Sequence, residues 1–328
     1  SIVKILSDVE IKGEDNIVSA VNYNGGSSST LQNAGKIITV DNTIDLQNAK
    51  NFTLVNEKNA VISSTGESIT ANRGNGNIIN AGVIESATES AITDDGLKPV
   101  DITNTGTISG DQETIFLKLN ENSTVTNSGT IESKNNSVIR FGGDENSFDA
   151  NARGVEFHLT NSGIIKAQGK YAIRGSYAED ALVENTAAGI IEANEKTVVL
   201  ENNIGSVLKN EGTIKSSGIH GVYAPSSDDL VIENAGTIQA SDKAVVLEKN
   251  SRLTNAGRIT ATDANADAIV VEGADNTVIL EAGSRVIGDI EAPAGNNSAG
   301  NNTLEIDVGS ARSVMYETTG DWNLEFID

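Results

Sequence analysis

The chain of 328 residues contains no cysteine, 3 prolines, 2 histidines and only 4% aromatic residues. The absence of cysteine excludes disulfides and thiolate metal sites. So few aromatic side chains do not suit the core of an ordinary α/β enzyme or an aromatic platform for sugars. A long secreted chain without thiols has nothing to oxidise while it crosses a periplasm, which favours export through a bacterial outer membrane to the cell surface or extracellular space.

Long apolar segments and an excess of basic residues are also absent. No stretch approaches the 18 consecutive apolar residues of a transmembrane helix, and residues 1–15 lack the apolar core of a signal peptide. We therefore expect neither a transmembrane helix nor a signal peptide. The 23 Lys and Arg face 46 Asp and Glu, which gives a net charge of −23. Such a chain repels nucleic acid and anionic lipids, so we expect no nucleic-acid partner and no membrane insertion by this segment.

The most informative feature that the sequence does have is a repeated phrase, [Leu/Ile/Val]-x-Asn-x-Gly-x-Ile. Eight uninterrupted copies place asparagines at Asn33, Asn80, Asn104, Asn127, Asn161, Asn210, Asn234 and Asn255 and glycines at Gly35, Gly82, Gly106, Gly129, Gly163, Gly212, Gly236 and Gly257. A ninth copy, with Asn185 and Gly189, is stretched by two residues. Degenerate copies at residues 54–62 and 280–287 lack the Gly and the Asn, respectively.

The phrase alternates with a period of two, which is typical of a β-strand. Its apolar residue, Asn, Gly and Ile share one parity and are expected to face inward, while the residues between them face water. Gly82, Gly106 and Gly129 are spaced by 24 and 23 residues. A second alternating strand follows in most periods. The pattern predicts an all-β, right-handed parallel β-helix of about eleven coils of about 23 residues.

In such a solenoid every coil turns a corner at the same position. We expect Gly there to tolerate a positive φ or a tight bend, and the inward asparagines to form a hydrogen-bonded ladder between coils. The repeat predicts a β-helix over residues 31–290, interrupted by an insertion loop at 141–154. Residues 1–30 are expected to form an N-terminal cap or first coil, and residues 291–328 a C-terminal cap.

The repeated Asn-x-Gly-x-Ile phrase resembles the passenger domains of bacterial autotransporters, the type V secretion proteins. Residues 279–307, followed by the sequence GDWNLEF, are similar to the end of such passengers. The resemblance implies a cell-surface rod of the self-associating or adhesive class. Its expected partner is a copy of itself on a neighbouring cell, or a protein or glycan on a host surface. A passive stalk for a catalytic domain elsewhere is an open alternative.

Recognition is expected where the repeat is broken, because irregular loops carry function more often than the scaffold does. The candidate residues are Phe141, Asp144, Phe148 and Arg153 in the insertion loop at 141–154, and Tyr223, Asp228 and Asp229 in a second loop at 223–229.

A polysaccharide lyase or hydrolase is the main enzyme alternative, because such enzymes also use β-helices. Asp94–Asp95, Asp228–Asp229 and the sequence GIHG at 218–221 resemble parts of polygalacturonase motifs, but their spacing and order differ. His158 is expected to face water. We therefore predict no enzyme, no catalytic residues, no metal site and no cofactor; weak Ca²⁺ binding by the acidic loops at 143–146, 226–229 and 263–267 stays an alternative.

Overall fold

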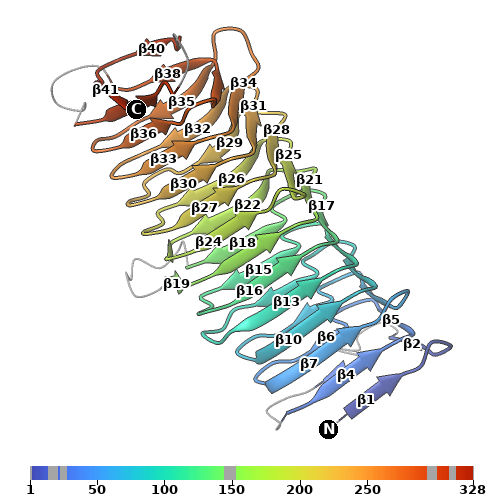
Figure 1. Cartoon of the computed structure of the whole chain (residues 1–328). Coiled ribbons are helices and arrows are strands. Elements are labelled where there is room, and N and C mark those ends of the chain that lie inside the picture. The colour runs from blue at the N-terminus through green and yellow to red at the C-terminus, as the bar shows by residue number, and fades with distance from the viewer. Residues whose placement is uncertain are drawn as a thin grey trace.

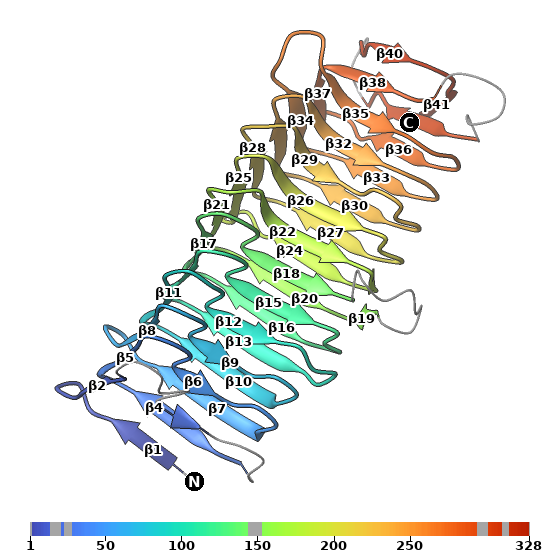
Figure 2. The same cartoon turned by 180° about the vertical axis from the view of Figure 1, so that it is seen from behind.

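The computed structural model describes residues 2–13, 21–22, 28–143, 153–293, 301–309 and 315–327. These residues contain β-strands and no helix. The chain winds into a rod in which three parallel sheets run along the long axis (Figures 1 and 2). Each regular coil contributes one strand to each sheet, as the alternating pattern requires. The predicted parallel β-helix is confirmed, with about twelve coils where the repeat predicted about eleven.

Sheet A contains the strands that end at the repeated asparagine. Its 14 strands in spatial order are β1 (Ile2–Ile5), β4 (Thr30–Asn33), β7 (Lys50–Asn56), β10 (Asn75–Asn80), β13 (Val100–Asn104), β16 (Thr124–Asn127), β20 (His158–Asn161), β24 (Leu182–Asn185), β27 (Val207–Asn210), β30 (Val231–Asn234), β33 (Arg252–Asn255), β36 (Thr277–Leu280), β39 (Thr303–Asp307) and β41 (Asn323–Ile327).

Sheet B begins immediately after the Gly of the phrase and carries its Ile. Its 12 strands are β2 (Glu10–Lys12), β5 (Lys36–Thr39), β8 (Val61–Ser64), β11 (Val83–Ser86), β14 (Thr107–Gly110), β17 (Thr130–Ser133), β21 (Ile164–Ala167), β25 (Ile190–Ala193), β28 (Thr213–Ser216), β31 (Thr237–Ala240), β34 (Arg258–Ala261) and β37 (Arg285–Ile287).

Sheet C holds the second alternating strand of each period. Its 13 strands are β3 (Val21–Asn22), β6 (Ile44–Asp45), β9 (Ile69–Thr70), β12 (Ile92–Asp94), β15 (Ile115–Lys118), β18 (Ile139–Gly142), β22 (Tyr171–Ser176), β26 (Lys196–Glu201), β29 (His220–Tyr223), β32 (Lys243–Leu247), β35 (Asp267–Val271), β38 (Asp289–Glu291) and β40 (Thr318–Thr319). The short strands β19 (Gly154–Val155) and β23 (Ala178–Glu179) pair beside the insertion.

The core is a set of columns, one residue per coil. The column of the phrase's Ile side chains is fully buried in every coil from Ile37 to Ile259. Burial of this apolar area stabilises the rod by about 2 kcal/mol per Ile, at about 25 cal/mol per Å². Because each coil packs mainly on its two neighbours, stability adds up along the rod.

The two ends of the described rod follow the same parallel pairing. At the N-terminal end β1 pairs with β4, and Ile2 is 70% exposed. At the other end β41 pairs with β39, and Phe326, which continues an interior column, is 69% exposed. Sheets A and C thus continue into residues 301–309 and 315–327. The caps expected at residues 1–30 and 291–328 stay predictions.

Candidate functional site

The corner between sheets A and B contains the asparagine ladder. From Asn33 to Asn234, each asparagine Nδ2 donates to the Oδ1 of the asparagine one coil further on, at 2.7–2.9 Å, and Asn255 is the last acceptor. The members are Asn33, Asn56, Asn80, Asn104, Asn127, Asn161, Asn185, Asn210, Asn234 and Asn255, all of them buried. The same Nδ2 atoms also reach backbone oxygens: Asn80 contacts Gly82 O at 3.2 Å and Thr107 O at 3.0 Å. The ladder therefore satisfies both the side chains and the backbone of the turn.

Asn56 belongs to the ladder although the sequence interpretation left it out. Its copy of the phrase reads Leu54, Asn56, Ala60, Ile62, which has the stretched spacing of the copy at Asn185 with Ala in the place of Gly. Strand β7 pairs with β4 and β10 so that Asn56 stands beside Asn33 and Asn80. The stretched copy around Asn185 was the signal that could have identified it.

The glycines of the phrase are required for a different reason than expected. None of those from Gly35 to Gly257 has a positive φ. Instead, a Cβ added to Gly106 would lie 2.1 Å from the carbonyl oxygen of Gly82, and one added to Gly129 would lie 2.1 Å from that of Gly106. Stacked turns approach so closely that a side chain has no room. Of the two expected reasons, a positive φ is wrong, whereas the glycines do lie at the bend between sheets A and B, where close backbone approach excludes a side chain.

The insertion contains fewer surface residues than expected. Phe141 is 2% exposed and its ring stacks on that of Phe157 with centroids 4.0 Å apart, so it packs the core and is not a recognition residue. The reason is its parity, since it continues an inward column of sheet C. Asp144 and Phe148 lie outside the described residues, as does most of the acidic segment 143–146. Arg153 is half-buried and donates to the carbonyl oxygen of Asn202 at 2.8 Å.

The second predicted loop presents two separate groups of side chains. Asp228 pairs with Lys249 Nζ at 2.9 Å and accepts from Asn250 Nδ2 at 2.7 Å. The hydrogen bonds from Lys249 and Asn250 lower the pKa of Asp228. Asp229 is exposed and has a positive φ of 58°. These acids therefore lie at a solvated corner with a basic neighbour.

Tyr223 points outward from sheet C and contacts basic side chains. Its ring stacks on His220 with centroids 4.6 Å apart, and Lys196 Nζ lies 4.3 Å from the ring centre. Burial lowers the pKa of His220 to about 4, with a further contribution from the charge of Lys196. Burial raises the pKa of Tyr223. At neutral pH His220 is therefore uncharged. His158 is exposed, as expected.

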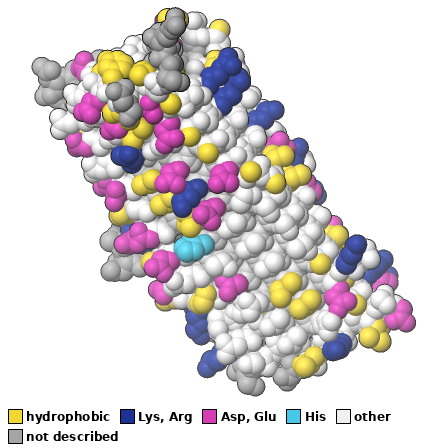
Figure 3. Space-filling view, viewed as in Figure 1, with side chains coloured by type: hydrophobic (Ala, Val, Ile, Leu, Met, Phe, Trp, Pro, Cys, Tyr) yellow, Lys and Arg dark blue, Asp and Glu magenta, His cyan; other side chains and the backbone are white. Residues whose placement is uncertain are grey.

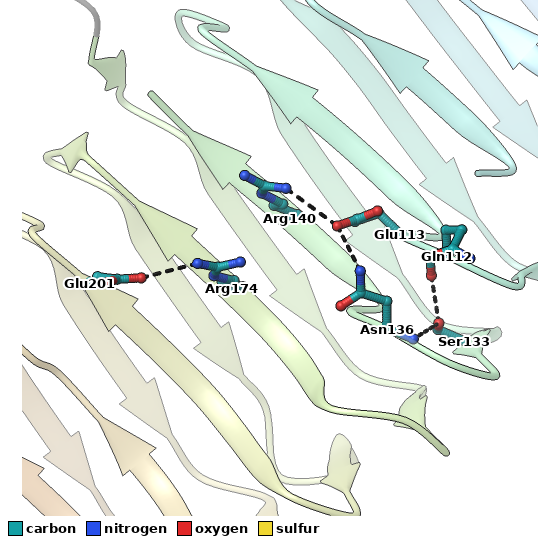
Figure 4. Close-up of polar contacts among 7 residues, drawn as sticks. All are labelled: Gln112, Glu113, Ser133, Asn136, Arg140, Arg174 and Glu201. Carbon is teal, nitrogen blue, oxygen red and sulfur yellow. Dashed lines mark hydrogen bonds and ion pairs between the residues drawn. The ribbon is translucent and has the colours of Figure 1, made fainter. Parts of the chain in front are cut away.

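Neighbouring strands of sheet C extend this arrangement into a row that sequence reasoning missed. Arg140 lies 4.9 Å above the Phe116 ring and pairs with Glu113 at 3.3 Å, while Arg174 pairs with Glu201 at 3.2 Å (Figure 4). Asn136 also donates to Glu113, at 3.0 Å. These residues are distant in sequence and not part of the repeat, so only the register brings them together. The guanidinium groups are held by carboxylates, as in a structural ion-pair network.

One carboxyl lies inside the rod. Asp94 is fully buried between inward columns of sheet C; it accepts from Asn120 Nδ2 at 2.8 Å and from the backbone N–H of Arg73 at 3.1 Å. Burial raises the pKa of Asp94 to about 7, and the hydrogen bond from Asn120 opposes this rise. The neighbouring Asp95 is exposed. The two acids of this pair therefore lie in different environments.

Acidic side chains border a hollow near the C-terminal coils. Its volume is about 730 Å³, and Asp263, Asp289 and Glu317 are among the residues that line it. Within the described ranges, no group of three or more His, Cys, Asp or Glu side chains is placed to hold a metal ion. The same ranges include no helix that could cross a membrane. Weak Ca²⁺ binding by the loop at 263–267 stays an open alternative.

Comparisons of the chain with protein-family models, with curated proteins and with solved structures gave no match.

Proposed function

We propose that the chain is an adhesive rod of a bacterial cell surface, exported across the outer membrane as an autotransporter passenger, which attaches cells to one another or to a host ligand. The observation that supports this most is the regular outer surface. Outward polar side chains form continuous columns over runs of consecutive coils, such as the six coils from Thr103 to Glu233 on sheet A. A surface of this kind offers many weak contacts in parallel, which suits attachment to another surface better than catalysis.

Sheet A shows this regularity. Thr103, Thr126 and Thr160 stand side by side on three consecutive strands, and further along the rod Glu184, Lys209 and Glu233 do the same. The middle of this face is a broad area with neither charged nor hydrophobic side chains (Figure 3). Hydroxyl columns can hydrogen-bond to another polar surface without the cost of desolvating paired charges.

A bead assay tests the proposal. Beads coated with the purified chain should clump, or should bind to cells, whereas beads coated with the heat-unfolded chain should not. If coated beads neither clump nor bind cells, the passive stalk becomes the better interpretation. Release of reducing ends or unsaturated sugars from a panel of polysaccharides would instead favour the lyase or hydrolase.

A further inference from the structure

The outer face of sheet B carries two adjacent columns of side chains over six consecutive strands, β14 to β31. The strands pair in continuous register, so each column holds one residue per coil. The first column, which we call the threonine–isoleucine column, consists of Thr107, Thr130, Ile164, Ile190, Thr213 and Thr237. The second, the charged column, consists of Ser109, Glu132, Lys166, Glu192, Lys215 and Gln239.

The strands that carry both columns lie along the right side of the rod in Figure 1, and the side chains of the columns are half-buried or exposed. Ile164 and Ile190, at the centre of the first column, are 38% and 39% exposed. Exposed apolar side chains that adjoin one another can bury their area against an apolar surface of a partner. In the charged column, Lys166 pairs with Glu192 at 2.7 Å, and hydrogen bonding and charge from Glu192 raise the pKa of Lys166.

The two columns are self-complementary when one is reversed. The first reads Thr-Thr-Ile-Ile-Thr-Thr in both directions. The second column has its centre between Lys166 and Glu192. Each acid on one side of this centre has a base at the same distance on the other side. We propose that a second copy of the chain packs antiparallel, face to face on sheet B, with the two-fold axis parallel to the strands and between β21 and β25. This inference rests on the proposed adhesive function and names its partner and surface.

In this arrangement unlike charges oppose each other at every charged position. Lys166 faces Glu192 of the second copy, and Glu132 faces its Lys215. Ile164 faces Ile190 of the second copy, so the apolar contact lies at the centre of the patch. Such a contact is isologous, which is the usual form of a homodimer interface.

Other registers are disfavoured by repulsion. A slide of one coil in one direction places Lys166 against its own copy and Glu132 against Glu192. A slide in the other direction places Glu192 against its own copy and Lys166 against Lys215. A parallel face-to-face pair would instead place the isoleucines against the charged column. Like charges across an interface suppress wrong pairings, so the charge order selects one register.

The contact is small enough to be weak by itself. Six strands at about 4.8 Å and four residues of about 3.3 Å give an area of roughly 400 Å² per copy. The total of roughly 800 Å² is below that of a standard stable complex. A single pair is therefore expected to dissociate readily, while many rods on two facing surfaces hold together through avidity.

Charge reversal on the full chain tests the inference. Variant one, Lys166→Glu with Lys215→Glu, makes the charged column acidic, and variant two, Glu132→Lys with Glu192→Lys, makes it basic. Sedimentation equilibrium should show each variant associating with itself at least about tenfold more weakly than the original chain. An equimolar mixture of the two should recover the association. The matched control, Lys58→Glu with Lys98→Glu in exposed turns outside sheets A and B, should associate like the original chain.

Circular dichroism and thermal unfolding establish that each variant is folded before association is measured. The inference is overturned if the folded sheet B variants associate as the original chain does, if their mixture fails to recover association, or if the original chain stays monomeric at millimolar concentration. Bead clumping separates the two proposals. If beads coated with either variant clump as strongly as the original, adhesion stands and the assignment to sheet B falls. If the original beads do not clump or bind cells, the proposed function itself falls.

Discussion

The corner between sheets A and B and the corner between sheets C and A satisfy buried polar groups in opposite ways. In the first corner, ten asparagines bond to one another and to the turns of the chain, and no buried ladder atom lacks a partner. In the second corner, Asn120 Oδ1 and Asn203 Nδ2 are buried without a hydrogen-bond partner among the described residues, and the carboxyl of Asp94 lies in the core.

The difference shows what repetition achieves. An amide that stacks on its own copy always has a donor beside an acceptor, so one solution serves every coil. A polar residue that occurs once needs a partner of its own, and each missing partner costs about 1–3 kcal/mol. The first corner is therefore the scaffold, and the second contains the residues whose environment differs from coil to coil.

The largest expected effect concerns the corner between sheets C and A, where the stability of the fold should depend on pH. The pKa of Asp94 rises from 3.8 in the unfolded chain to about 7 in the folded one, because burial disfavours the charged form. The folded state thus binds the proton more tightly. Below pH 3.8 the buried carboxyl does not lower the free energy of unfolding. As the pH rises from 3.8 to 7 it lowers this free energy progressively, by about 4 kcal/mol in total at 1.36 kcal/mol per pKa unit.

Asp94→Asn should therefore be more stable than the original chain at pH 8, by about 4 kcal/mol, and similar to it at pH 4. Urea unfolding at both pH values measures this. Asp95→Asn is the matched control, since Asp95 is exposed. An equal pH dependence for Asp94→Asn and the original chain would show that the buried carboxyl is not the cause.

The next largest effect concerns the corner between sheets A and B, where the turns of successive coils stack. Gly106→Ala should destabilise the rod by about 3 kcal/mol, because the new Cβ meets the Gly82 carbonyl oxygen at 2.1 Å and must separate two stacked turns. Gly283→Ala is the control: Gly283 has a φ of 84° and open space around its Cβ position, so about 1 kcal/mol is expected. Thermal unfolding compares the two. A loss for Gly106→Ala no larger than that for Gly283→Ala would contradict the explanation by close backbone approach.

Removal of one asparagine from the ladder should lower the free energy of unfolding by somewhat less. Asn127→Ala leaves Asn104 Nδ2 and Asn161 Oδ1 without their ladder partner, and a loss of about 2 kcal/mol is expected. Asn255→Leu removes the last rung, beside Leu280 in the same column, and is expected to cost less than about 1 kcal/mol. Urea unfolding measures both. Equal losses would mean that the ladder bonds contribute little beyond local packing.

The smallest effect is expected at the solvated loop. Lys249→Ala removes the ion pair with Asp228, which is largely exposed to solvent. Screening by water leaves such pairs worth less than about 0.5 kcal/mol. Unfolding curves in low and high salt should nearly coincide with those of the original chain, and a loss above 1 kcal/mol would show that this loop helps to hold the coils together.

Much of the scaffold was predictable from the sequence alone. The spacing of Asn33, Gly35 and Ile37, repeated at about 23 residues, predicted strands, inward parity and stacked coils, because period-two alternation and a fixed repeat leave few other architectures. The ladder followed for nine asparagines. Asn56 was missed because a two-residue stretch and an Ala in place of Gly disguised its phrase.

Only the tertiary structure decided what residues outside the phrase do. Register between coils brings Arg140 to Glu113 and places Lys166 between Glu132 and Glu192, residues with no fixed spacing in the sequence. It also buries Phe141, at the start of the insertion, and Asp94, which lies outside the repeated phrase. A local pattern fixes which way a side chain points along its own strand, whereas its neighbours on adjacent strands depend on loop lengths that differ from coil to coil. The sequence by itself therefore determined the coil, and the stacking of coils determined the surfaces.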